Sequence, residues 1–303
     1  GGLLMPLLIK EGYSKLFSLG LITVAGSLGL LFPPSLPLII YGVTAGVSVK
    51  AIFLAGIVPG IIRISMIGGW AVWQGKVQSV KRHRLNWADI KSSLWEAKWE
   101  AVIPLFILFG IFGGFTTLVE TAAMTAVYVY IIEVVIHKDL DWPNLKTIIL
   151  DCATLIGGVL IILGVAMGLT SYLVDAQIPL QLLEWVKSTI ESKLVFLLIL
   201  NIFLLAVGCM MDIFSAIIIV VPLITPLGAY FGIDPVHLAI IFIANLELGF
   251  LTPPVGMNLF LSAYRFGEDM PTIYKSTLPF FMVMLVSVLA ITYIPILSTW
   301  SGN

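Results

Sequence analysis

Charged side chains are scarce in this sequence of 303 residues. Only 11% of the residues are Asp, Glu, Lys or Arg, and the formal net charge is −1. An average soluble domain carries about 25% charged residues, and proteins that bind nucleic acid carry clustered basic faces. The shortage of charge therefore argues against a soluble protein, and the near-neutral balance argues against a nucleic-acid partner.

Residue patterns that would indicate catalysis or a structural metal are also missing. The two cysteines, Cys152 and Cys209, lie far apart in apolar stretches, and the three histidines are scattered along the chain. Neither residue type shows the spacing of metal ligands. The sequence has no HExxH, GxSxG or P-loop motif, the patterns of zinc hydrolases, serine hydrolases and nucleotide hydrolases. We expect no enzyme activity and no cofactor.

Apolar residues, in contrast, make up 59% of the chain. One crossing of a membrane takes roughly 20 apolar residues. Segments 101–114 and 117–136 are expected to be two helices joined at Gly113-Gly114. The sequence predicts an all-α polytopic membrane protein, surrounded by lipid, whose apolar segments are 15–47, 51–74, 101–114, 117–136, 147–169, 194–228, 238–263 and 279–300.

Three of these segments are interrupted. Residues 33–37 read PPSLP, residues 252–256 read TPPVG, and residues 208–212 read GCMMD. A Pro-Pro pair interrupts a helix, and bare backbone at membrane depth persists only where protein or a wet cavity surrounds it. We expect two broken helices and, at 194–228, a re-entrant hairpin.

The distribution of Lys and Arg predicts the orientation. If 194–228 is a re-entrant hairpin, twelve of these residues fall on one side, three on the other, and Arg63 lies within a span. Basic loops are cytoplasmic by the positive-inside rule. The long loop 75–100, with Trp87, Trp95 and Trp99, predicts an amphipathic helix in the cytoplasmic interface; a nucleic-acid patch is the rival interpretation.

The two broken helices share a pattern. Residues 29–34 and 249–254 both match G-x-L-x-P-P, and the charge count gives their helices opposite directions. Paired broken helices of an inverted repeat form substrate and ion sites in secondary transporters. By this symmetry, residues 1–10 are the returning arm of a first hairpin. Since the chain opens GGLLMP, we expect a fragment that does not transport without that hairpin.

Four stretches carry a family resemblance. They are GYSKLFSLGLITVAGSLGLLFPPSLPLIIYGVTAGVSVKAIFLAGIVPG at 12–60, PLFILFGIFGGFTTLVETAAMTAVY at 104–128, IDPVHLAIIFIANLELGFLTPPVGMNLFLSA at 233–263 and LPFFMVMLVSVLAITYIP at 278–295. The chain resembles roughly the last 70% of the large membrane subunit of TRAP (tripartite ATP-independent periplasmic) transporters. It departs from the family's TPTEAAA motif, reading TLVETAA at 117–123.

The resemblance implies a Na⁺-coupled importer of organic acids, of the C4-dicarboxylate or sialic-acid type, in the bacterial inner membrane. It also implies a small membrane subunit, a periplasmic solute-binding protein and an elevator mechanism. The alternatives are a channel-like or structural membrane subunit, or a non-functional truncated permease fragment.

We divide the chain accordingly into parts of a transport domain and a scaffold. Residues 1–50 are the returning hairpin arm and first broken helix, and 194–263 are the re-entrant hairpin and second broken helix; both are assigned to the transport domain. Residues 51–100, a span plus the amphipathic helix, and 264–303, the last span, are assigned to the scaffold. Residues 101–193 are further membrane helices.

Unwound backbone exposes carbonyl oxygens, which suit a hard cation such as Na⁺, and half-helix ends add partial charges of either sign. The alternative is that the prolines merely kink packed helices. The candidate residues are Gly26, Ser27, Gly29 and Pro33 for a first Na⁺ site, Gly208, Asp212, Gly249, Thr252 and Pro253 for a second, and Ser35, Glu247 and Asn258 for the substrate.

Further polar residues lie within apolar segments. Asp212 at the hairpin tip is either functional, as membrane-depth carboxylates tend to be, or the N-cap of the returning half-helix; Glu120 raises the same question. Arg63 could bind a substrate carboxylate, although snorkelling or pairing with a partner subunit is favoured. Asn201 and Asn245 could bind ligand or bond between helices, the commoner use.

Overall fold

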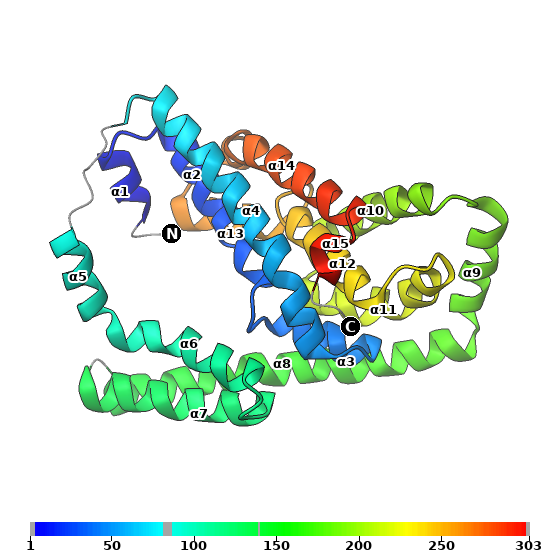
Figure 1. Cartoon of the computed structure of the whole chain (residues 1–303), viewed down its shortest axis with the longest axis horizontal. Coiled ribbons are helices and arrows are strands. Elements are labelled where there is room, and N and C mark those ends of the chain that lie inside the picture. Colours follow the sequence, from blue (N-terminus) through cyan, green and yellow to red (C-terminus); the bar gives the residue numbers. More distant parts are fainter. Residues whose placement is uncertain (1–3, 81–86, 139, 301–303) are drawn as a thin grey trace. The chain divides into compact units, whose positions relative to one another are not determined.

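The computed structural model describes residues 4–80, 87–138 and 140–300, and its regular elements in these ranges are all helices (Figure 1). The chain divides into two compact units. The first comprises Gly1–Lys81 and Leu163–Asn303, and the second comprises Arg82–Ile162. The helical content and the five helices long and apolar enough to span a membrane confirm the predicted all-α polytopic class.

The first unit contains both broken helices. Its N-terminal helices are α1 (Leu4–Lys10), α2 (Lys15–Ala25), the 3₁₀ turn η1 (Leu28–Leu31), α3 (Leu36–Ala45) and α4 (Val49–Val77). Its C-terminal helices are α9 (Ile178–Thr189), α10 (Lys193–Met210), α11 (Ile213–Tyr230), α12 (Pro235–Gly249), α13 (Met257–Phe266), α14 (Met270–Tyr293) and α15 (Ile296–Thr299).

The second unit holds a helical hairpin. Its helices are α5 (Trp87–Glu96), α6 (Lys98–Phe112) and α7 (Leu118–Tyr130), which continues as the π-helix η2 (Ile131–Ile136). Helix α8 (Trp142–Asp175) begins in this unit and ends in the first. The predicted junction at Gly113-Gly114 is confirmed between α6 and α7, and α5 is a helix as expected for loop 75–100. Part of that loop, Lys81, Arg82, His83 and Arg84, lies outside the described residues.

The breaks in the apolar segments are confirmed where the sequence predicts them. The first broken helix stops at Leu31 and resumes at Leu36 with a 42° bend. The second stops at Gly249 and resumes at Met257, and the hairpin turns between Met210 and Ile213. Both Pro-Pro bonds, Pro33-Pro34 and Pro253-Pro254, are cis. Because α10 and α11 each pass the length and hydropathy test for a span, the re-entrant course stays a prediction.

The last apolar segment needs a correction. It was expected at 279–300, but α14 runs from Met270 to Tyr293 and a short α15 follows. The helix begins earlier because Asp269 stands at the N-cap position and Pro271 in the first turn, and both favour helix initiation. Its first two turns carry polar side chains, which hydropathy alone does not mark as a span.

Helix α12 is the centre of the first unit. All fourteen of its residues from Val236 to Gly249 are buried, and α3, α4, α10, α11, α14 and η1 pack around it. Glycines permit the closest contacts: a Cβ on Gly249 would lie 2.6 Å from Cα of Gly208 on α10. Small residues let membrane helices approach in this way.

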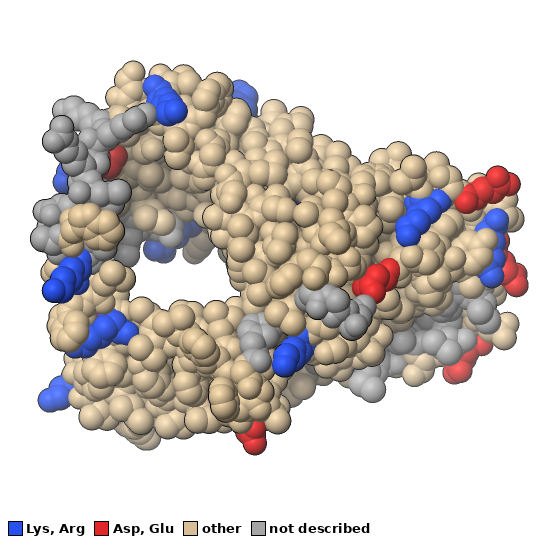
Figure 2. Space-filling view, in the orientation of Figure 1, with Lys and Arg blue, Asp and Glu red and all other residues tan. Residues whose placement is uncertain are grey.

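The remaining surface is poor in charge. Figure 2 shows few Lys, Arg, Asp or Glu side chains on the visible face. Large apolar side chains are exposed on several helices, for example Phe109, Val119 and Ile161 at 69%, 77% and 70%. A surface of this kind is stable in a lipid solvent, where apolar side chains need no cover.

Candidate functional site

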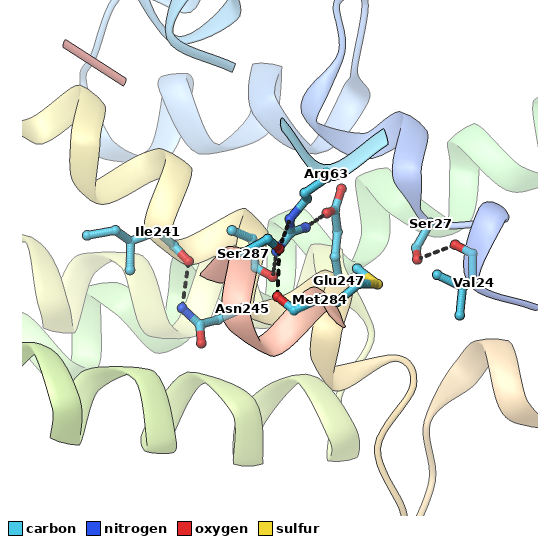
Figure 3. Close-up of polar contacts among 9 residues, drawn as sticks. Val24, Ser27, Arg63, Ile241, Asn245, Glu247, Met284 and Ser287 are labelled. Carbon is cyan, nitrogen blue, oxygen red and sulfur yellow. Dashed lines mark hydrogen bonds and ion pairs between the residues drawn. The ribbon is translucent and has the colours of Figure 1, made fainter. Parts of the chain in front are cut away.

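The first break leaves two buried hydroxyl groups at its ends. Ser27, 2% exposed, follows α2 and its hydroxyl donates to the Val24 carbonyl at 3.1 Å (Figure 3). Ser35, 5% exposed, stands at the N-cap position of α3, and its hydroxyl has no hydrogen-bond partner within the described chain. A buried hydroxyl without a partner costs free energy, so the Ser35 hydroxyl is free to donate a hydrogen bond, and its role as a ligand stays a prediction.

The second break is held to the hairpin tip. The Gly256 amide donates to the Cys209 carbonyl at 3.2 Å, and Gly208 lies against Gly249 as described above. The tip residues 208–212 also line one pocket together with Val255, Met257, Phe260 and Leu261. Thr252 and Pro253 line a different pocket, against α14. The structure therefore places Gly208 against Gly249, and the Thr252 amide donates to the Gly249 carbonyl at 2.9 Å. Asp212 lies in the hairpin tip with Gly208, and Pro253 faces α14.

The two broken helices meet each other crosswise. Asn258 on α13 donates to the Thr23 carbonyl on α2 at 3.3 Å, and the Thr23 hydroxyl donates to Ser262 on α13 at 2.8 Å. On the other side of the breaks, α3 and η1 pack against α12. The half-helix before one break thus contacts the half-helix after the other, the arrangement expected of an inverted repeat.

The half-helices that follow the breaks begin without a side-chain cap. The Ser35 side chain at the start of α3 accepts no hydrogen bond from its own helix, and Gly256 at the start of α13 has no side chain to cap with. The first amides of a helix carry partial positive charge and have no partner within the helix. Both half-helix starts can therefore accept an anionic group.

Asp212 is the N-cap of α11. Its carboxylate accepts hydrogen bonds from the Phe214 and Ser215 amides, both at 3.0 Å, and from the Ser215 hydroxyl at 2.5 Å. This confirms the capping alternative, and a role as a cation ligand stays a prediction. Glu120 also has a capping role: it forms a reciprocal capping box with Thr117 at the start of α7, in the second unit.

Arg63 and Glu247 form a buried ion pair between α4 and α12 (Figure 3). Their side chains are 1% and 0% exposed. Arg63 also donates to the Ser287 hydroxyl on α14 at 3.2 Å and to the Ala244 carbonyl at 2.8 Å. The favoured snorkelling of Arg63 is therefore wrong, because the guanidinium lies inside the protein and its carboxylate partner belongs to the same chain.

A second polar cluster joins α10, α12 and α14. The Asn201 side-chain oxygen accepts from the Asn245 amide at 2.6 Å and from the Thr292 hydroxyl at 3.0 Å. Both asparagines thus bond between helices, the commoner use of such residues in membranes. His237 extends the buried polar network, with Nδ1 2.5 Å from the Ser298 hydroxyl. Sequence reasoning missed Thr23, Ser262, Ser287 and His237 as contact residues, because single hydroxyl and imidazole groups in apolar runs carry no spacing signal.

Comparisons with known proteins identify the family of the chain. A family model described as "Tripartite ATP-independent periplasmic transporter, DctM component" matches residues 1–297. The chain belongs to the DctM family. The resemblance stated from the sequence is thereby confirmed, and the family places the chain among transport components.

The chain matches a different share of each relative's own length. The isethionate TRAP transporter permease protein DctMQ of Oleidesulfovibrio alaskensis is 33% identical over 298 residues, 97% of this chain and 47% of the relative. The C4-dicarboxylate TRAP transporter large permease protein DctM of Vibrio cholerae is 32% identical over 99% of this chain and 71% of its own length. The protein of the same description from Pseudomonas aeruginosa is 33% identical over 100% and 72%. The chain thus spans about half to three quarters of these relatives.

Proposed function

We propose that this chain forms the core of the large permease subunit of a TRAP transporter that imports organic-acid anions through the bacterial inner membrane. The observation that carries the proposal is the crosswise meeting of two Pro-Pro-broken helices in a member of the DctM family. The relatives are named for isethionate and C4-dicarboxylates, which supports an anionic organic solute. The small TRAP membrane subunit and a periplasmic solute-binding protein are the proposed partners.

The solute would bind where uncapped half-helices begin. The amides at the start of α3 and α13 favour a carboxylate or sulfonate, and the unpartnered Ser35 hydroxyl would donate a further hydrogen bond to it. Asn258 sits in the first turn of α13 and its amide already reaches α2, so it would order both half-helices around the solute. Glu247 is assigned a structural role instead, because Arg63 neutralises it.

Sodium would bind to the backbone of the breaks. The first break contains the carbonyl oxygens of Gly26, Ser27 and Gly29; those of Ser27 and Gly29 already accept from the Leu30 and Phe32 amides and would offer Na⁺ their second lone pair. The second break would offer oxygens of Gly208 and Asp212 at the hairpin tip, with Gly249 against Gly208. Carbonyl and carboxylate oxygens suit a hard cation. Cations at both breaks would also neutralise the charge of an anionic solute, which is the physical reason for coupling the two.

The packing leads us to move the boundary of the transport domain. The division made from the sequence assigned residues 51–100 and 264–303 to a scaffold, but α4 and α14 pack around α12. Arg63 on α4 forms the buried ion pair with α12, and Ser287 on α14 accepts a hydrogen bond from Arg63. Helices that share a desolvated charge pair move together, because separation would leave both charges unpaired. We propose that the first unit is the moving body of an elevator.

Solute counterflow tests the class of function. Proteoliposomes that contain the full-length permease with its small subunit are loaded with unlabelled organic acid and diluted into labelled acid plus binding protein. A carrier exchanges the two and transiently accumulates label. A channel-like or structural subunit, or a non-functional truncated fragment, does not, and absence of accumulation with every acid tested would overturn the proposal.

A further inference from the structure

Three metal-ligating side chains converge in the second unit, which the proposed transport site does not involve. They are Glu100 in the first turn of α6, Glu133 in η2 and His137 at the end of η2. One ligand atom from each lies within 4.8 Å of the others. The sequence argued against a metal site because its histidines are scattered. The folded hairpin instead brings Glu100 to Glu133 and His137, which lie 33 and 37 residues further along the chain.

The local backbone explains the convergence. Glu133 and His137 are four residues apart, and residues at i and i+4 share one face of a helix. The His137 amide donates to the Ile132 carbonyl at 2.8 Å, a bond across five residues that closes the π-helix. Helix α6 packs beside α7, and the Tyr128 hydroxyl donates to the Trp99 carbonyl at 3.1 Å. This contact holds the start of α6 against α7 (Figure 1), and the Glu100 carboxylate lies within 4.8 Å of the ligand atoms of Glu133 and His137.

A surface ion pair accounts for only two of the three side chains. The His137 Nδ1 to Glu100 Oε1 distance is 3.8 Å, which is within ion-pair range but longer than a hydrogen bond. A His137–Glu100 pair would also leave the negative charge of the Glu133 carboxylate beside the like charge of Glu100. The ammonium group of Lys98, two residues before Glu100, lies 4.1 Å over the Trp95 ring. Two carboxylates around one imidazole form a site of net negative charge.

The ligand set selects the type of cation. Imidazole nitrogen suits Zn²⁺, Ni²⁺ and Co²⁺, whereas Mg²⁺ and Ca²⁺ prefer oxygen ligands throughout. Tetrahedral Zn²⁺ binds at about 2.0–2.2 Å from His nitrogen and carboxylate oxygen, so its ligand atoms lie roughly 3.3 Å apart. The ligand atoms lie within 4.8 Å of one another, so metal binding would require the two glutamate side chains to rotate toward the imidazole.

We propose that Glu100, Glu133 and His137 form a binding site for a divalent transition metal of the zinc class, which clamps the start of α6 to the end of α7. Water completes the coordination, as in three-ligand zinc sites. The positive-inside count places this end of the hairpin at the cytoplasmic surface, where it would meet the cellular metal pool. The site lies in the second unit and does not depend on the proposed transport function.

The test is metal binding to the purified, detergent-solubilised full-length protein. Titration calorimetry with Zn²⁺ is expected to show one saturable site whose occupancy raises the melting temperature. His137→Ala and Glu133→Gln should each weaken binding by more than about tenfold, since even outer-shell partners contribute 10–100-fold. The matched control, Glu96→Gln, removes a carboxylate of the same unit on α5 and should bind as the wild type does.

Cobalt provides the second readout. Co²⁺ bound to this site should show visible d–d absorption without a thiolate charge-transfer band, because neither Cys152 nor Cys209 belongs to the cluster. A thiolate band, binding unchanged in His137→Ala, or no saturable Zn²⁺ binding would overturn the proposal. If His137→Ala does not fold, Glu100→Gln decides, since this side chain is half exposed and its loss leaves the helices intact.

Discussion

Removal of one partner from the Arg63–Glu247 pair is expected to destabilise the protein severely. The two side chains are 1% and 0% exposed, so no water replaces a missing partner. Arg63→Met leaves an uncompensated carboxylate in the core, and Glu247→Gln leaves an uncompensated guanidinium. Loss of one member of a buried pair typically costs about 3–5 kcal/mol, consistent with ~4 kcal/mol for two charges 4 Å apart at an effective dielectric constant of 20.

The double variant Arg63→Met/Glu247→Leu should recover most of this loss. Replacement of a buried pair by apolar residues of similar size is often neutral or stabilising. The Ser287 hydroxyl keeps its hydrogen bond to the Met284 carbonyl at 2.6 Å. The loss that is not recovered is the hydrogen bond from Arg63 to the Ala244 carbonyl. A typical hydrogen bond contributes about 0.5–1.5 kcal/mol net to the free energy of unfolding.

Thermal unfolding of the purified protein measures the difference. At about 2–4 °C per kcal/mol, each single variant should melt at least about 6 °C below the wild type and the double variant within about 6 °C of it. Arg265→Met removes an exposed cation and serves as the control with little change. A double variant as unstable as the sum of the single variants, or single variants without effect, would refute the reasoning.

Two further predictions concern the second broken helix and the hairpin. Gly249→Ala should lower both the melting temperature and uptake, because its Cβ would lie 2.6 Å from Gly208. The control Gly68→Ala places a Cβ with nothing within 4 Å and should be neutral or up to ~1 kcal/mol stabilising. Equal effects of the two substitutions would contradict the close contact. Asp212→Ala should cost about 0.5–2 kcal/mol through loss of the cap, and Asp212→Asn should retain the cap but raise the Na⁺ concentration for half-maximal uptake. An unchanged Na⁺ dependence in Asp212→Asn would remove Asp212 from the cation site.

The sequence predicted the features that depend on local chemistry. Long apolar runs predicted the helices, and the Pro-Pro pairs at 33–34 and 253–254 predicted both breaks, because two successive prolines beyond the first turn remove two helical hydrogen-bond donors. The turn at Asp212 followed from a carboxylate in an apolar run. These signals need no knowledge of neighbouring helices.

Features that depend on packing between helices could not be predicted from the sequence alone. Arg63 and Glu247 lie 184 residues apart, and nothing in either neighbourhood shows that one neutralises the other. The same holds for Asn201 with Asn245. Gly208 and Gly249 were expected in one site because each lies at a break, but their close backbone contact depends on packing. The start of α14 was missed for a different reason, since its polar first turns carry helix-initiating residues but little hydropathy.

The most direct test of the central claim is uptake by proteoliposomes that contain the full-length permease, the small subunit and the binding protein. Organic acids are screened with and without an inward Na⁺ gradient. We predict accumulation that requires both Na⁺ and the binding protein and that falls when Ser35 or Asn258 is replaced by alanine. Accumulation that is indifferent to Na⁺ and to these two residues would contradict a coupled site at the meeting point of the broken helices.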